Sequence, residues 1–392
     1  MRSILRLGSP LVALVLLAIA CADAEEPNFL EPEVDGGTMP EVDASPDDAG
    51  RSDGDADATA PRECSDDGFC HTALPKNQVL RGVWGDGAGT VWTVSEQGFV
   101  LRWDGSKWNT QADRLGFLTT VWGASPTDVW VGGQDGLFHG TGGSPDKLTF
   151  VQTPDIVGEI VSIWGQSSTD VWAVLAGPDG SHVLHYADVE GQLAWSPVMV
   201  GTPESRFMRV WGSGGTGIWL SGFELDLDSF WETGVVYRLL PGATDFEPVP
   251  MPGYPGMDPD NPFWSFGEVI SASIASDEHI VIQARAVEGG AMIVRGSRAN
   301  AGEEFSFEAE IDGTFLDPAT HAIASFGPND LWTAGEHGRI RHWDGSGWTP
   351  MAVTITKYPM ISPVFGLWAK APNDFWAVGD NIAFHYDPTK KR

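Results

Sequence analysis

LTTVWGASPTDVWVGGQDGLFH, residues 118–139, is the clearest copy of a pattern that recurs along this chain. Two tryptophans, Trp122 and Trp130, stand eight residues apart; glycine follows the first, and aspartate lies two residues before the second. Short alternating apolar stretches are broken by Gly, Pro, Ser and Asp, which is typical of strands and turns. Helical periodicity is absent. We therefore expect short antiparallel strands joined by tight turns.

The pattern divides most of the chain into seven units. Its second tryptophan position is held by Trp92, Trp130, Trp172, Trp219, Val281, Trp332 and Trp376. Successive positions are 38 to 62 residues apart. Repeats of roughly 40 residues with three or four short strands are typical of β-propeller blades. The sequence therefore predicts an all-β fold, a seven-bladed β-propeller.

The two ends of the repeat region complement each other. The last unit stops at residues 385–387 and has no fourth strand. Residues 69–75, FCHTALP, resemble the outer strand of another unit at residues 150–154, FVQTP. We predict that this N-terminal segment completes the last blade and closes the ring.

Two positions in the repeat vary together. The third strand carries a basic residue in every unit, histidine in four and arginine in three. The residue two before the second tryptophan position is aspartate in those same four units only. Because paired variation between copies indicates contact, we predict a hydrogen bond between each histidine and the aspartate of its unit, holding the turn between strands two and three. The predicted pairs are Asp128 with His139, Asp170 with His185, Asp330 with His342, and Asp374 with His385.

The motif W-G-x4-D-V-W, followed in two units by W-D-G-x-x-W, resembles the tryptophan-rich propeller repeats of bacterial secreted lipoproteins. It is similar to tectonin-type lectin repeats and, more distantly, to the Asp-box propellers of sialidases and to WD40 propellers. The resemblance covers residues 80–388 and implies an architecture. It does not imply an activity, because propellers host many functions.

The N-terminus reads as an export signal. Arg2 and Arg6 precede an apolar run that is too short to span a membrane as a helix. Residues 17–21, LAIAC, resemble a bacterial lipobox, which implies lipidation of Cys21 and an exported protein anchored in the outer membrane by lipid alone. An ordinary secretory signal cleaved nearby is the alternative. We expect a signal peptide over 1–21, a linker over 22–62 and the propeller over 63–392.

The segment after the signal is strongly acidic. Residues 22–70 hold 16 acidic and two basic side chains. Residues 22–62 therefore read as a disordered linker, because such a composition cannot bury enough apolar surface to offset its ordering entropy. Cys64 and Cys70 are the two remaining thiols in an exported setting, which favours a disulfide between them; two cysteines alone make a poor metal site.

Composition excludes several functions. The chain has 54 acidic and 23 basic residues, a net charge of −31, which argues against nucleic acid because phosphate binding needs a basic patch. No nucleophile elbow, phosphate loop or zinc-protease motif is present. Sialidase chemistry would need three convergent arginines and a tyrosine nucleophile with a glutamate partner, in a chain with only five tyrosines. We expect no cofactor, no metal and no catalysis.

The 18 tryptophans sort by repeat position, and 16 of them fall on blade strands. The remaining two, Trp231 and Trp264, lie in the longest insertion, predicted over about 222–266 between units four and five. The candidate ligand-binding residues there are Trp231, Trp264, Phe230, Tyr254, Asp226 and Asp228. Aromatics beside carboxylates suit a sugar or a protein anchor; the alternative is that they only pack the insertion onto the ring. The two functional hypotheses are a monomeric, membrane-tethered binding propeller for a protein or glycan partner, and an exported glycan-processing hydrolase of sialidase-like type.

Overall fold

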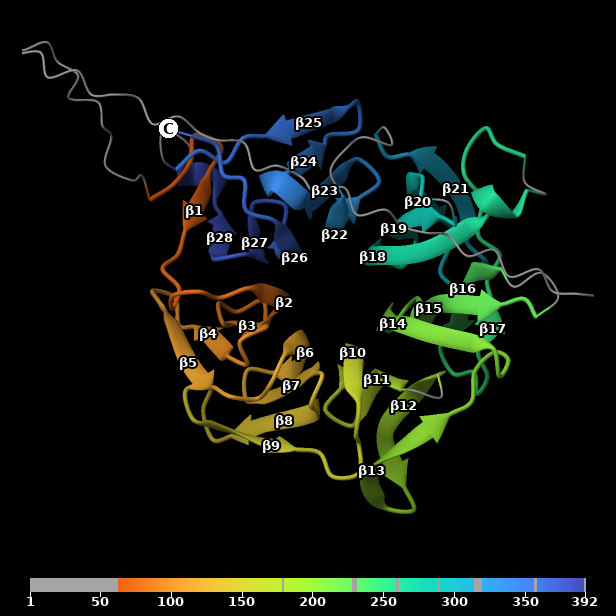
Figure 1. Ribbon diagram of the computed structural model, residues 1–392, viewed down its shortest axis with the longest axis horizontal. Helices are drawn as coiled ribbons and strands as arrows, with labels where there is room; N and C mark the ends of the chain where they lie inside the picture. The colour runs from red at the N-terminus through yellow and green to blue at the C-terminus, as the bar shows by residue number, and fades with distance from the viewer. Residues whose placement is uncertain are drawn as a thin grey trace, which may run out of the picture. The chain divides into compact units, whose positions relative to one another are not determined.

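The computed structural model describes residues 63–177, 180–227, 231–258, 261–287, 289–313, 319–355 and 358–390. These residues form seven four-stranded antiparallel sheets set around a central axis (Figure 1), which confirms the seven-bladed β-propeller. The predicted signal peptide with Cys21 and the predicted linker over 22–62 lie outside the described residues. Within the described part of the chain, no helix is long and apolar enough to cross a membrane.

Six blades use their four strands in chain order from the axis outward, and in blade 7 the outer strand is β1 instead. The first strands are β2 (Leu80–Gly85), β6 (Leu118–Ser125), β10 (Glu159–Ser167), β14 (Ser205–Ser213), β18 (Phe266–Ser276), β22 (Thr320–Gly327) and β26 (Val364–Ala371). The second strands are β3 (Val91–Ser95), β7 (Asp128–Gly133), β11 (Asp170–Gly177), β15 (Gly217–Leu225), β19 (His279–Ala286), β23 (Asp330–Gly335) and β27 (Asp374–Gly379). The third strands are β4 (Val100–Trp103), β8 (Gly136–Gly142), β12 (Gly180–Val189), β16 (Glu232–Leu239), β20 (Ala291–Ser297), β24 (Ile340–Trp343) and β28 (Ile382–Tyr386). The outer strands are β5 (Trp108–Ala112), β9 (Leu148–Gln152), β13 (Gln192–Val198), β17 (Glu247–Pro248), β21 (Ser306–Ile311), β25 (Trp348–Met351) and β1 (Phe69–His71). Three short 3-10 helices are η1 (Pro262–Trp264), η2 (Glu336–Gly338) and η3 (Pro388–Lys390).

The ring closes through the N-terminal strand, as predicted. β1 pairs with β28 as the outer strand of blade 7, with Phe69 opposite Tyr386. The Trp108 indole of blade 1 donates to Thr72 Oγ1, whose hydroxyl donates to the Ala383 carbonyl, so the closing segment also bridges two blades. The predicted disulfide between Cys64 and Cys70 is confirmed and ties the residues just before β1 to this strand.

The Trp-Gly dipeptide of the repeat has a packing cause. A side chain on Gly123 would place its Cβ 2.6 Å from the Trp84 ring of the preceding blade. Only glycine permits this approach, because interiors are already close-packed. The same contact joins Trp122 to Gly165, Trp164 to Gly212, and Trp368 to Gly85 across the closure. The first repeat tryptophans therefore link consecutive blades.

The second repeat tryptophans are core residues, each no more than 4% exposed in the six blades that have one. Each stands directly opposite the basic residue of the third strand, as Trp130 does opposite His139. All four predicted Asp–His contacts are present, with Nε2–Oδ1 distances of 2.7 to 2.9 Å. The predicted location of the restrained turn was wrong. Asp128 ends the turn between strands one and two, since it pairs with Ser125, so the bond ties that turn to the third strand.

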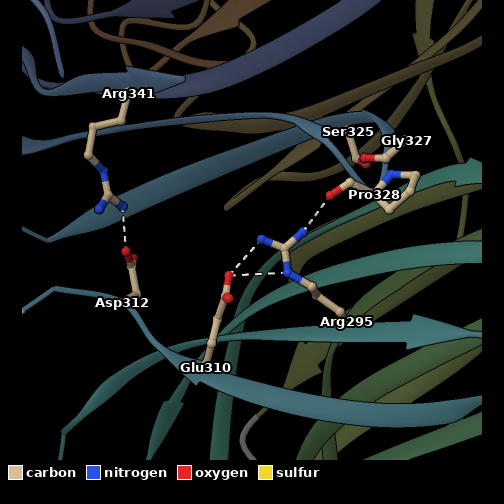
Figure 2. A network of polar contacts seen from close by, with 7 residues as sticks. All are labelled: Arg295, Glu310, Asp312, Ser325, Gly327, Pro328 and Arg341. Carbon is tan, nitrogen blue, oxygen red and sulfur yellow. Dashed lines mark hydrogen bonds and ion pairs between the residues drawn. The ribbon is translucent and has the colours of Figure 1, made fainter. Parts of the chain in front are cut away.

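Blades 5 and 6 are joined by a buried ion pair (Figure 2). Arg341 on β24 donates from Nη2 to Oδ1 of Asp312, just after β21, at 2.5 Å, and the two side chains are only 8% and 1% exposed. The amide of Gln283 donates to the other carboxylate oxygen at 2.9 Å. This ion pair adds to the apolar contacts between the two blades, where Val281 of blade 5 packs with Ile323 and Leu331 of blade 6.

Candidate functional site

The mouth of the central channel is a polar concave surface of the propeller. Because consecutive first strands pack side by side around the axis, residues near their beginnings converge on one opening of about 400 Å³. The lining residues come from all seven blades and are Arg81, Thr119, Val161, Arg209, Glu268, Ile270, Arg285, His321 and Phe365. Three arginines thus gather at one point of a strongly acidic protein.

Two of the arginines are paired. Arg81 donates from Nε to Glu96 at 2.5 Å, and its guanidinium carbon lies 3.8 Å from the centre of the Phe365 ring. Arg285 lies 3.6 Å from a carboxylate oxygen of Glu268. These contacts fix the positions of two positive groups at the rim while leaving about a third of each arginine side chain exposed.

Arg209 has a different environment. Its Nε donates to the Val269 carbonyl at 2.9 Å. Among the described residues, no hydrogen bond or ion pair engages its two terminal nitrogens. Surrounding protein lowers the pKa of the guanidinium by desolvation, and Glu268 partly opposes this, yet an arginine stays charged at neutral pH. Arg209 therefore presents a positively charged fork whose geometry matches a carboxylate.

A second cleft of about 590 Å³ shares Glu268 and Arg285 with the channel mouth, so the two form one continuous surface. Its lining includes Phe223, Leu225 and Trp231. The Trp231 ring meets Phe263 edge to face at 4.8 Å between ring centres. An aromatic and aliphatic cleft therefore opens beside the arginines. We name the combined region the arginine face.

The segment predicted as one insertion is in fact two loops, because β16 and β17 lie within it and pair with blade 4. Residues 226–231 join β15 to β16, and residues 249–265 join β17 to β18. The backbone amide of Asp226 donates to the Trp231 carbonyl at 2.9 Å, which places Asp226 at the base of the first loop. Asp228 and Phe230, also in this loop, lie outside the described residues.

The other two aromatic candidates do not line the cleft. Tyr254 and Trp264 pack on each other at 5.4 Å, and Tyr254 covers Gly290, where a Cβ would lie 2.4 Å from its ring. Tyr254 also packs against the apolar core of blades 4 and 5. These two residues therefore pack the loop onto the propeller, which was the alternative to ligand binding. Of the described candidate residues, Trp231 is the one on the arginine face.

The three arginines were missed from the sequence. Arg81 stands three residues before the first tryptophan of its unit, Arg209 two before, and Arg285 near the end of a second strand, so they share no repeat position. A signal was available: the residue three before the first tryptophan position lines the channel in six units. In blade 4 the equivalent residue is Met208, and Arg209, one residue later, lines the channel instead.

The opposite end of the channel is also hollow. There the first tryptophan position is held by Ser273 in blade 5 and Ala324 in blade 6, and a space of about 650 Å³ remains between Trp164, Trp211 and blade 7. Lys370 is the charged residue among its lining. Among the residues that the structure describes, no cluster of three or more His, Cys, Asp or Glu could hold a metal ion.

Solved structures resemble this chain in fold. YCF48 from Cyanidioschyzon merolae matches with a TM-score of 0.58 and 12% identity, covering 82% of this chain and 99% of its own. Virginiamycin B lyase from Staphylococcus aureus has a TM-score of 0.58 and 12% identity, with coverage of 81% and 98%. The WD40 repeats of RRP9 give 0.56 and 9%, with coverage of 83% and 99%.

YCF48 bound to D1 peptide is similar as well, with a TM-score of 0.55, 15% identity, and coverage of 81% of this chain and 96% of that one. No protein-family model and no curated protein matches the sequence significantly. At identities of 9 to 15%, the likeness shows the fold alone, and these structures include one with a bound peptide and one of a lyase.

Proposed function

We propose that this protein is a binding propeller that holds a protein partner on the arginine face. The observation that carries the proposal is Arg209, whose charged fork lies in the channel mouth with its terminal nitrogens unengaged by the described residues. A carboxylate of the partner would accept hydrogen bonds from that fork. An apolar side chain of the partner would enter the adjacent cleft beside Trp231.

The chemistry of this face suits protein recognition. Arginine and tryptophan are the residues that most often dominate binding energy at interfaces, especially where a surrounding rim excludes water. Arg209 supplies hydrogen-bond donors for a carboxylate, while Arg81 and Arg285, held in place by Glu96 and Glu268, line the same channel mouth. YCF48, which shares the fold, has been solved with D1 peptide bound, which is consistent with peptide binding by a propeller of this class.

The proposed setting is the bacterial envelope. We infer that Cys21 is lipidated and that residues 22–62 separate the propeller from the membrane. The confirmed disulfide between Cys64 and Cys70 supports export, since such bonds persist in oxidising compartments. Metabolic labelling with a palmitate analogue tests the anchor. The wild-type protein should be labelled and Cys21→Ser should not; equal labelling of both would exclude lipidation at Cys21.

A glycan-processing hydrolase is the second candidate, because three arginines do converge, as sialidase-like chemistry requires. The nucleophile counts against it, since no tyrosine lines the channel mouth. Tyr237 is near a carboxylate, but burial first and then Glu224 raise the pKa of its hydroxyl, the opposite of what a nucleophile needs. Hydrolysis of aryl glycosides by the wild-type protein, lost in Arg209→Gln, would favour this candidate.

The test of partner binding is affinity capture from the envelope of the producing cell with full-length protein. Arg209→Gln removes the fork, Arg209→Lys keeps the charge without the fork, and Lys107→Gln removes a charge from an exposed turn outside this face. We expect Lys107→Gln to capture the same partner as wild type and both Arg209 variants to lose most of it. Equal capture by all four proteins would refute the arginine face as the binding site.

A further inference from the structure

We propose that blade 5 carries a separate slot that binds a fused aromatic ring such as indole. Six blades place a tryptophan at the second repeat position, where it fills the space between its own blade and the next. In blade 5 this position is Val281, directly opposite Arg295 on β20. A cavity of about 280 Å³ lies at this place.

The slot occupies the position of the Asp–His–Trp cluster seen in other blades. Its lining includes His279 at the aspartate position, Val281 at the tryptophan position and Arg295 at the histidine position. Ser297 and Glu308 of blade 5 and Pro328 of blade 6 complete the rim. The cavity therefore opens where other blades carry this cluster, while Leu331, Trp343 and Trp348 of blade 6 pack in the same apolar cluster as Val281.

Size and polarity both fit an aromatic ring. Val281 forms an apolar floor and is only 2% exposed. A cavity of about 150 Å³ with apolar walls is enough to bind benzene, so 280 Å³ accommodates a larger ring system. The rim is open, which gives a ligand a way in from solvent through Ser297 and Glu308, both exposed.

Arg295 forms a rigid wall of the slot (Figure 2). Its Nη2 and Nε donate to Glu310 at 2.7 and 3.2 Å, and its Nη1 donates to the Pro328 carbonyl at 2.9 Å. The guanidinium carbon already lies 5.2 Å from the centre of the Trp343 ring of blade 6, so this planar group stacks on an aromatic ring in the structure itself. Blade 4 shows the filled arrangement, because Arg238 at the same repeat position lies 4.7 Å from the centre of the Trp219 ring.

The slot is independent of the arginine face. Glu268 of that face lies near the beginning of β18, whereas His279 begins β19 and pairs with Ser276 at the end of β18. The two sites therefore lie at opposite ends of blade 5, and a ring in the slot leaves the channel mouth open. Failure of one proposal does not affect the other.

Fluorine NMR with fluoroindole as the probe tests the slot on the full-length protein. We expect saturable line broadening with the wild type. Val281→Trp supplies the missing indole covalently and should weaken probe binding at least tenfold. The matched control is Ile311→Trp, which adds the same ring at an exposed position of blade 5 outside the slot. Absence of binding to the wild type at millimolar probe, or equal binding to both variants, would overturn the proposal.

A second variant guards against misfolding of Val281→Trp. Ser297→Phe narrows the exposed rim without entering the core and should also weaken binding. Unchanged probe binding to both this variant and a folded Val281→Trp would contradict the proposal.

A competition experiment distinguishes a small-molecule ligand from a tryptophan side chain of a peptide. Displacement by free indole alone indicates a small-molecule slot, and displacement by a Gly-Trp-Gly peptide as well indicates one that accepts a tryptophan side chain. Displacement by neither would refute specific binding.

Discussion

The Nε2 atom of His185 lies 2.9 Å from Oδ1 of Asp170, and this contact recurs in four of the seven blades. The His185 ring also stacks on Trp172 with 3.9 Å between ring centres, and the Trp172 indole donates to the same carboxylate oxygen. Three strand positions are therefore tied together by one side-chain cluster. The first two predictions concern this cluster.

His185→Ala should destabilise the propeller. It leaves a half-buried carboxylate without one of its donors, at a cost of about 1–3 kcal/mol, which corresponds to a Tm lower by several degrees. The control is His182→Ala, an exposed histidine on the same strand, β12. Thermal unfolding followed by circular dichroism measures both. A Tm unchanged in His185→Ala would show that the pair contributes nothing to stability.

The stability that the Asp170–His185 pair contributes should depend on pH. The hydrogen bond from His185 holds the pKa of Asp170 below its usual value; burial opposes this shift, and the Trp172 indole adds to it. Because the pKa is lower in the folded state, the stabilisation is complete above the usual aspartate pKa of about 4 and is lost as the pH falls through the native value. The urea midpoint of Asp170→Asn should therefore differ most from wild type near neutral pH. A difference that stays constant down to about pH 3 would contradict the assignment.

Gly123→Ala should be costly although it adds one methyl group. The new Cβ would lie 2.6 Å from the Trp84 ring, and overpacking of this kind costs about 1–3 kcal/mol. Gly143→Ala in the same blade is the control, because a Cβ there has no neighbour within 4 Å. Chemical denaturation should separate the two variants clearly. Equal midpoints would mean that the indole moves aside without cost.

The junction between blades 5 and 6 depends on the buried pair shown in Figure 2. Asp312→Asn leaves the Arg341 charge buried without its partner, and breaking a buried pair costs about 3–5 kcal/mol. Lys370→Gln, at an exposed pair with Asp374, should change stability by less than about 1 kcal/mol. Denaturant unfolding measures both variants. Similar losses in the two would contradict a special role for the junction.

Much of this architecture can be predicted from the sequence because the blade pattern occurs in seven units. Comparison of the seven units predicted the number of blades, the closing strand and the Asp–His pairs, because a residue type that recurs at equivalent positions is unlikely to be there by chance. The location of the Asp turn was misjudged because spacing alone does not tell whether residue 128 ends one turn or precedes the next. The pairing of Ser125 with Asp128 decides it.

The candidate site was harder to predict, for a physical reason. Arg81, Arg209 and Arg285 come from three different positions of the repeat and meet only because strands from all blades converge on the axis. Composition instead drew attention to Tyr254 and Trp264, which pack on each other, with Tyr254 also against the core of blades 4 and 5. Trp231, a candidate for ligand binding from the sequence, lines a cleft, but the charged half of the surface could be identified only from the three-dimensional arrangement.

Site-specific photocrosslinking tests the central claim most directly. A photoreactive phenylalanine replaces Trp231 on the arginine face in one protein and Ser106, in the exposed turn between β4 and β5, in another. After illumination in the producing cell, the account predicts a discrete protein adduct from position 231, weakened by adding Arg209→Gln, and none from position 106. Adducts of equal intensity from both positions, or from position 106 alone, would contradict the claim that the arginine face holds the partner.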